Sequence, residues 1–115
     1  MAVTVSRRTV PPVTVVEVVG DIDPESAPTL RCELRATIDT MGPQVVLDFS
    51  RVDFMDSSGL HLLLAVQSWC QAAGGSLRVA AVHGAPARVL DVCAFDQLID
   101  IVPTSESAVE NAGSG

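Results

Sequence analysis

The chain has 115 residues, a formal net charge of −7, and 48% hydrophobic residues against 18% charged ones. This length fits one domain with a single core, and the hydrophobic fraction argues against a disordered chain. The negative charge repels nucleic acid backbones and anionic lipid headgroups. With one tryptophan and no tyrosine, the chain also lacks an aromatic platform for stacking bases. We therefore expect no direct nucleic acid partner and favour a protein partner that carries a basic patch.

The N-terminal segment, the apolar runs and the cysteines indicate in which cellular compartment the protein is expected. The N-terminal segment lacks the apolar stretch of a signal peptide, and the longest apolar run, around residues 60–66, is too short to cross a bilayer. We expect a cytoplasmic protein without membrane insertion. Cys32, Cys70 and Cys93 form no C-x-x-C pair. We interpret them as reduced, mostly buried thiols rather than as a zinc or redox site.

The first two predicted elements are a strand and an amphipathic helix. Residues 13–19 are β-branched and almost all apolar, which predicts a strand covered on both faces. The acidic turn DIDPES follows, with Asp23 expected as the N-cap and Pro24 in the first helical turn. Gly42 and Pro43 are expected to end this helix. Its apolar stripe, at spacings of three and four, consists of Ala27, Leu30, Leu34, Ile38 and Met41.

The rest of the chain alternates in the same way. We predict a second strand at residues 44–49 and a largely buried second helix at residues 58–73. A third strand at 76–82, a short third helix at 86–93 and a short edge strand at 95–102 follow. The tail from Thr104 is expected to hold at most one marginal helical turn. This alternation predicts an α/β fold. The loops at 21–25 and 53–58 both follow strands, so they should meet at the edge where ligands of such sheets gather.

The segment DFMDSSGLHLLL, residues 53–64, places two serines at the start of the second helix. One interpretation is that Asp56 or Ser57 is only an N-cap, which contributes ~1 kcal/mol. A serine hydrolase is disfavoured because the G-x-S-x-G elbow is absent, His61 lies on the same helix, and His83 has no placed partner. Nucleotide binding is disfavoured because the sequence has no phosphate-loop motif and no lysine. We therefore expect no enzyme activity.

A further interpretation makes a serine of this segment a phosphorylation site. A phosphate at a helix start faces free backbone N–H groups and the positive end of the helix dipole, so the fold should tolerate it. The phosphate adds roughly −1.5 to −2 charges next to Asp56 and near Asp53 and Asp21. A partner docked on this edge would then meet added bulk, a desolvation cost and like charge. Such a site switches binding without unfolding the domain.

Three segments together resemble the STAS-domain anti-sigma factor antagonists, also called anti-anti-sigma factors. VVLDFSRVDFMDSSGLHLLL resembles their central motif, VVEVVGDIDPESAPTLRCEL their first strand, acidic turn and first helix, and LRVAAVHGAPARVLDVCAF their third strand and helix. The resemblance covers about residues 10–103 and implies that residues 1–115 form a single STAS domain. The implied α/β fold has a four- to five-stranded mixed sheet, with about four helices packed mainly on one face.

The resemblance also implies a partner-switching role. In that family the unphosphorylated protein binds an anti-sigma factor with serine kinase activity, which frees the sigma factor. The kinase phosphorylates the antagonist and releases it, and a PP2C-type phosphatase resets the cycle. The family's phosphate acceptor falls on Ser58, with Ser57 as the alternative. Neither a cofactor nor a metal is implied.

Other positions carry further implications of the resemblance. The positions that it assigns to partner contact are Asp21, Asp23, Asp56, Ser57, Gly59 and His61. At Gly59 the absent side chain is expected to let the partner's backbone come close. Ala94 stands where relatives often have glycine, so a left-handed backbone there would cost ~1 kcal/mol. A second use of this fold stays open, as a docking subunit of a bacterial ABC-type lipid-transport complex.

Overall fold

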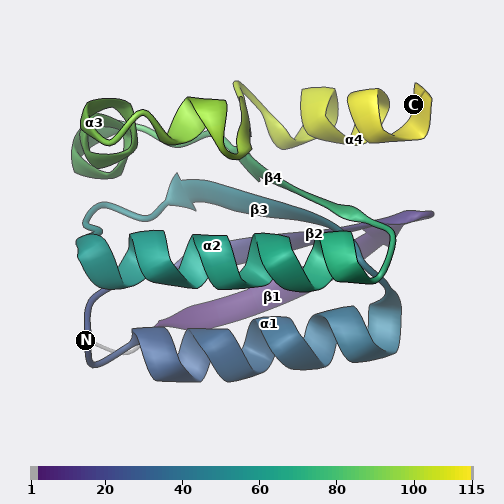
Figure 1. Cartoon of the computed structure of the whole chain (residues 1–115), viewed down its shortest axis with the longest axis horizontal. Helices are drawn as coiled ribbons and strands as arrows, with labels where there is room; N and C mark the ends of the chain where they lie inside the picture. Colours follow the sequence, from purple (N-terminus) through teal and green to yellow (C-terminus); the bar gives the residue numbers. More distant parts are fainter. Residues whose placement is uncertain (1–2, 115) are drawn as a thin grey trace.

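The computed structural model describes the backbone of residues 3–114 and the side chains of residues 3–109. One mixed sheet runs through the middle of the molecule (Figure 1). Its strands have the spatial order β1-β2-β3-β4-β5. β1 is antiparallel to β2, and the other neighbours are parallel. The strands are β1 (Thr4–Val10), β2 (Val13–Val19), β3 (Gln44–Arg51), β4 (Ser76–Ala80) and β5 (Asp100–Val102). The expected α/β fold with a mixed sheet is confirmed, and β5 is the predicted edge strand.

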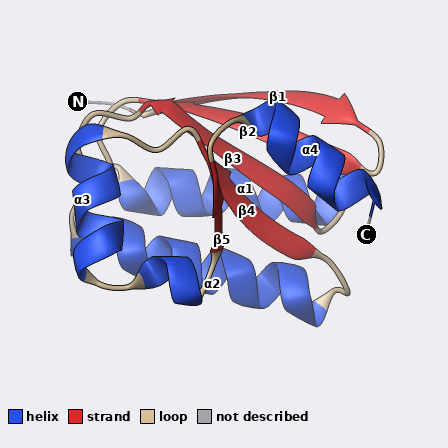
Figure 2. Cartoon of the chain, turned by 90° about the horizontal axis from the view of Figure 1, so that it is seen from above, coloured by secondary structure: helices blue, strands red, loops and turns tan. Residues whose placement is uncertain are grey.

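The helices are distributed unequally over the two faces of this sheet. α1 and α2 lie side by side on one face, α4 crosses the other, and α3 lies at one end (Figure 2). The helices are α1 (Ala27–Met41), α2 (Ser57–Ala72), α3 (Gly84–Val92) and α4 (Ser105–Ser114), and a short 3-10 turn spans Phe95–Gln97. α2 was expected to be largely buried, but it buries only the face that carries Leu62, Leu63 and Val66, while Leu64 is exposed.

Strand β2 explains why the sheet has helices on both faces. Its side chains alternate, so Val16 and Val18 enter the larger core beneath α1 and α2, while Val13 and Val15 enter a smaller core beneath α4. All four side chains are buried. The predicted double coverage of residues 13–19 is thus confirmed, because a strand that is apolar on both sides must be covered on both.

The tail forms a longer helix than expected. α4 spans 10 residues instead of one marginal turn. Thr104 and Ser107 exchange hydrogen bonds at its start, and the Ser105 hydroxyl donates to the Asp48 carboxylate of β3 at 3.0 Å. Ala108 is fully buried in the smaller core. This helix is stabilised by contacts with the sheet, which local composition does not reveal.

The predicted burial of the cysteines is confirmed for Cys70 and wrong for the other two. Cys70 is buried, and its burial raises the pKa of its thiol to about 11. Cys32 and Cys93 are exposed, because they lie on the outer faces of α1 and of the turn after α3.

Within the part of the chain that the structure describes, no group of three or more His, Cys, Asp or Glu side chains is placed to hold a metal ion. In the same residues, no helix combines the length and apolar character needed to span a membrane.

The backbone at Ala94 is left-handed, as its position after the third helix suggested. Its φ is 54° and its ψ is 36°. An alanine in this region costs about 1 kcal/mol relative to glycine. The strained residue reverses the chain between α3 and the 3-10 turn, and this reversal places Phe95 in the larger core.

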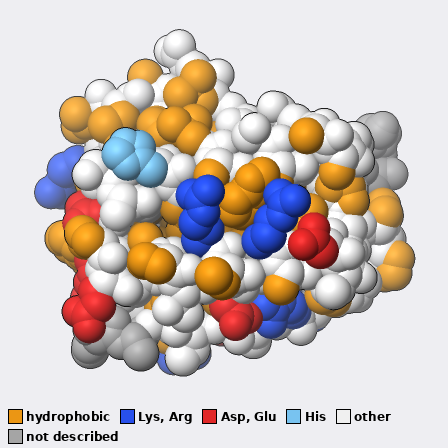
Figure 3. Space-filling view, turned by 60° about the horizontal axis from the view of Figure 1, so that its bottom comes forward, with side chains coloured by type: hydrophobic (Ala, Val, Ile, Leu, Met, Phe, Trp, Pro, Cys, Tyr) orange, Lys and Arg blue, Asp and Glu red, His pale blue; other side chains and the backbone are white. Residues whose placement is uncertain are grey.

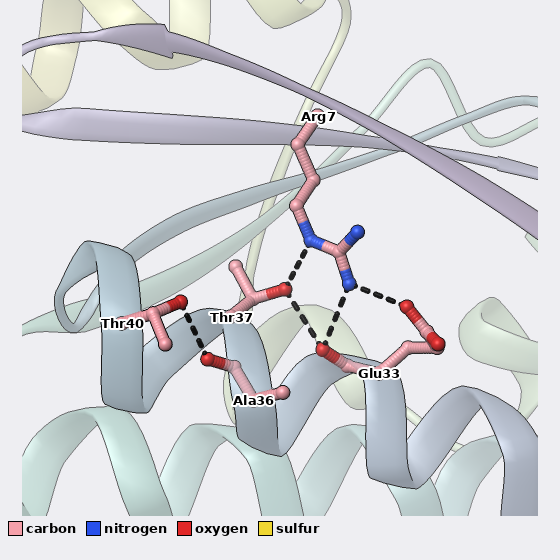
Figure 4. Close-up of polar contacts among 5 residues, drawn as sticks. All are labelled: Arg7, Glu33, Ala36, Thr37 and Thr40. Atoms are coloured by element: carbon pink, nitrogen blue, oxygen red, sulfur yellow. Dashed lines mark hydrogen bonds and ion pairs between the residues drawn. The ribbon is translucent and has the colours of Figure 1, made fainter.

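β1 is a strand that the sequence did not predict, and Arg7 ties it to α1. β1 is mostly exposed and contains two adjacent arginines, so it lacks an apolar alternation. The Arg7 guanidinium donates to the Thr37 hydroxyl at 2.5 Å, to the Glu33 carbonyl at 3.1 Å and to the Glu33 carboxylate at 2.6 Å (Figure 4). Thr37 in turn donates to the Glu33 carbonyl at 2.8 Å. A surface strand is thus fixed to a helix by one polar cluster.

The substitution Arg7→Ala should lower the free energy of unfolding by about 1 kcal/mol. Charged hydrogen bonds are lost, but their contribution is reduced by the partial exposure of both side chains. Urea unfolding monitored by circular dichroism measures the change. Arg8→Ala, at the neighbouring exposed position of the same strand, is the control and should change stability by less than about 0.5 kcal/mol. Equal effects of the two substitutions would contradict the role of the cluster.

Candidate functional site

Two loops that are far apart in sequence are joined at the carboxyl edge of the sheet. The Ile22 N–H donates to the Phe54 carbonyl at 2.9 Å, and the Asp56 N–H donates to the Ile22 carbonyl at 3.3 Å. Ile22 and Met55 thereby form an isolated parallel bridge beyond the ends of β2 and β3. The prediction that the loops at 21–25 and 53–58 meet at one edge is confirmed. The acidic turn therefore lies directly beside the start of α2.

The acidic turn is closed by its own side chains. Asp23 accepts hydrogen bonds from the backbone N–H groups of Ser26 at 2.8 Å and of Glu25 at 3.0 Å. The bond from the Ser26 N–H is the main reason that the pKa of the Asp23 carboxyl lies below its ordinary value. Asp23 therefore stays ionised at neutral pH. The stability that it contributes is present above its unfolded-state pKa and is lost as the pH falls through the lowered value.

This turn also corrects the predicted start of α1. Asp23 was expected to be the N-cap, but the helix begins at Ala27 with Ser26 as the N-cap residue. Pro24 lies in the preceding turn, and Pro28 takes the position near the helix start. The Ser26 hydroxyl donates to the Asp21 carbonyl at 2.7 Å and makes no cap bond. The extra turn moves the helix start by about three residues.

Asp56 has two functions at the start of α2. It is the N-cap residue, with an extended backbone, and its Oδ1 accepts the Ser58 N–H at 2.9 Å. The same oxygen accepts a short hydrogen bond from the Ser58 hydroxyl. The capping interpretation of Asp56 is thus confirmed. The contact also fixes the direction of Ser58 Oγ, because one carboxylate oxygen binds both donors of that residue.

Ser58 is half-buried and lies on the wall of an open depression of about 290 Å³ between α1 and α2. Ser57, one residue earlier, is exposed, as is His61 one turn later. The remaining lining residues are Pro24, Ala27, Pro28, Arg31, His61 and Leu62. The sequence did not single out Arg31, which it placed off the apolar stripe of the first helix. Only the packing of α1 against α2 brings Arg31 to the same depression as Ser58.

The structure gives Gly59 a different role from the one expected. Gly59 is buried, and a Cβ atom there would lie 2.2 Å from Met55 Cγ and 3.2 Å from Ile22 Cγ2. The missing side chain therefore makes room for the buried Ile22–Met55 bridge beneath the helix. The expectation that Gly59 leaves space for a partner's backbone is wrong, because the position that its Cβ atom would occupy faces the core.

The described residues do not form the hydrogen bonds of a serine hydrolase. The Ser58 hydroxyl donates to a carboxylate rather than to a histidine. His83 Nε2 lies 2.9 Å from the Ser50 carbonyl and 4.0 Å from the Asp53 carboxylate. A triad needs a hydrogen bond between the serine and the histidine, and no such bond joins Ser58 to either histidine among residues 3–109.

The fold is that of a STAS domain. The sequence profile of the STAS domain matches residues 4–108, so the chain belongs to the STAS domain family. It is 30% identical over 95 residues to the anti-sigma-B factor antagonist of Bacillus subtilis (strain 168), covering 83% of this chain and 86% of that protein.

Solved structures agree with this assignment. An anti-sigma factor antagonist from Mycobacterium paratuberculosis superposes with a TM-score of 0.86 at 29% identity, over 96% of this chain and 93% of that one. The anti-sigma factor antagonist SpoIIAA shares the fold at 20% identity. Its unphosphorylated form has a TM-score of 0.70 over 94% of this chain and 96% of its own, and its phosphorylated form has 0.71 over 94% and 98%.

The substitution Gly59→Ala should destabilise the domain by about 1 kcal/mol. Overpacking against Met55 costs about 1–3 kcal/mol, and the better helix propensity of alanine offsets about 1 kcal/mol of this. In a Met55→Ala background the clash with the Met55 side chain is gone and only the 3.2 Å approach to Ile22 Cγ2 remains, so Gly59→Ala should destabilise the domain much less. A double-mutant cycle by urea unfolding measures this coupling. Additive effects would contradict the internal role of Gly59.

The substitution Asp56→Ala should lower the free energy of unfolding by about 1 kcal/mol, because the N-cap bond to the Ser58 N–H is lost. Asp56→Asn is the matched control, since asparagine is an equally good N-cap, and it should stay within about 0.5 kcal/mol of the unsubstituted protein. Chemical denaturation compares the three proteins. If the alanine and asparagine variants are equally stable, Asp56 does not cap α2.

Proposed function

We propose that this protein is an anti-sigma factor antagonist that binds its anti-sigma factor while Ser58 is unmodified and releases it when Ser58 is phosphorylated. The observation that carries the proposal is the position of Ser58, with its hydroxyl held by Asp56 at an open depression at the start of α2. The names of the relatives from Bacillus subtilis and Mycobacterium paratuberculosis support the class of function.

Electrostatics supports a switch at this serine. Phosphorylation adds roughly −1.5 to −2 charges. It also removes the hydroxyl proton through which Ser58 donates its hydrogen bond to Asp56. An attractive contact is replaced by repulsion between a phosphate and a carboxylate. The acidic turn, with Asp21 and Asp23, lies beside the same helix start. A partner that binds this edge with basic groups would have to desolvate and accommodate a much denser negative charge.

The domain itself should tolerate the phosphate. The positive end of the helix dipole favours negative charge at the first turn of α2, and the depression beside Ser58 is open to solvent. The two buried cores lie beneath the helices and away from the added group. In support, SpoIIAA has been solved in both the unphosphorylated and the phosphorylated form, and both forms share this fold.

The partners in this proposal are an anti-sigma factor with serine kinase activity and a PP2C-type phosphatase. The sequence has no lysine and no phosphate-loop motif, so the kinase supplies the nucleotide site. The partner surface consists of the exposed and half-buried polar residues around Ser58, namely Asp21, Asp23, Asp56, Ser57 and His61. Ser57 is the alternative acceptor because its side chain is the more exposed of the two.

Incubation with the cognate anti-sigma kinase and Mg-ATP should add one phosphoryl group, seen by intact-mass spectrometry. Ser58→Ala should abolish the addition, and Ser57→Ala should preserve it. Ser58→Asp should weaken binding to the kinase by at least about tenfold in calorimetry with an unchanged melting temperature, because the added charge meets the docked partner.

The neutral variant Ser58→Asn is the control for size and should bind more tightly than Ser58→Asp. Full binding by Ser58→Asp would contradict electrostatic exclusion, and phosphate on the Ser58→Ala protein would move the acceptor to another residue. Co-purification with an ABC-type ATPase, together with normal behaviour of Ser58→Ala, would instead favour the lipid-transport docking role.

A further inference from the structure

The outer face of α1 and α2 carries a second open depression next to the one that contains Ser58. On this face, basic side chains flank an apolar area (Figure 3). The second depression measures about 610 Å³ and includes Arg35, Asp39 and Trp69. Arg31 belongs to the walls of both depressions. Arg31 is therefore the cation placed between Trp69 and the serine.

In the unmodified protein the guanidinium of Arg31 lies over the Trp69 ring. The guanidinium carbons of Arg31 and Arg35 each lie 5.0 Å from the centroid of the Trp69 ring. Arg35 also has an ion pair with Asp39 at 3.7 Å. Among the side chains of residues 3–109, no carboxylate lies within ion-pair distance of Arg31. Two like charges thus share one ring, and Arg31 is the one without a counter-ion.

A phosphate on Ser58 would change this balance. It would enter the depression that Arg31 lines, with Asp56 as a repelling neighbour and the exposed His61 on the same helix. An arginine binds a phosphate through two parallel, charge-assisted hydrogen bonds. At an exposed site such a pair is stronger than contact with an aromatic face. The dianion therefore favours movement of the Arg31 side chain from Trp69 towards Ser58.

We propose that Arg31 is the counter-ion of phosphorylated Ser58 and that it leaves the face of Trp69 to bind the phosphate. This inference rests on the proposed function and deepens it, since it names a residue of the same domain whose side chain moves when Ser58 is phosphorylated. The pairing would join α1 to the start of α2. It would also remove a basic group from the α1–α2 face, so phosphorylation alters a second surface besides the acidic edge.

The experiment uses the full chain with phosphoserine incorporated at position 58 during translation, and phosphorus NMR to follow the second ionisation of the phosphate. A cation favours the dianion and lowers the second pKa, so its removal raises it. Arg31→Gln should raise the phosphate pKa by about 0.5. Arg35→Gln and His61→Gln are matched controls, and each should change it by less than half as much. Equal effects of Arg31→Gln and Arg35→Gln would overturn the proposal.

Trp69 provides an independent readout, because it is the single tryptophan of a chain without tyrosine. Phosphorylation should change its emission spectrum towards that of the unphosphorylated Arg31→Gln protein. In the Arg31→Gln background the phosphate should leave the spectrum unchanged. A phosphate-dependent spectral change of equal size with and without Arg31 would contradict the movement.

Both measurements are made without any partner. A failure of partner binding or of kinase recognition would therefore refute the proposed function and leave these two results standing. Conversely, an unchanged phosphate pKa in Arg31→Gln would refute the pairing, while release of the partner by phosphorylation could still be observed in calorimetry.

Discussion

The backbone pairing of Ile22 with the segment around Met55 is the contact on which the site depends. It continues the parallel pairing of β2 with β3 beyond the strand ends and joins two loops that would otherwise move independently. Both side chains are buried, and Gly59 lies against them without a side chain of its own. α2 can therefore begin directly over the bridge. The position of Ser58 relative to the acidic turn is consequently set by core packing.

Asp56 connects the stability of α2 to the chemistry of its first turn. One carboxylate oxygen accepts both the backbone N–H and the hydroxyl of Ser58. A modification of that hydroxyl must therefore act first on the N-cap. The cost stays local, because the cores beneath α1, α2 and α4 do not include these polar groups. This separation explains how a domain can change its surface charge strongly at one residue and keep its fold.

The elements that sequence patterns missed are those that depend on contacts between distant segments. β1 is exposed, and it is held by pairing with β2 and by the Arg7 cluster on α1. α4 is rich in serine and alanine, and it is held by the hydrogen bond from Ser105 to Asp48 and by buried Ala108. Neither segment carries the apolar periodicity from which strands and helices are predicted. Their stabilising partners lie many residues away.

Local sequence patterns were sufficient to predict the order of elements from β2 to β5 and the meeting of both site loops at one edge. They were also sufficient to predict Asp56 as an N-cap. Alternation, turn residues and capping preferences act over a few neighbouring residues, so they can be read along the chain. The three-dimensional packing alone decided that Gly59 faces inward and that Arg31 shares a depression with Ser58. These features depend on how closely α2 approaches α1 and the bridge, and no local pattern encodes that distance.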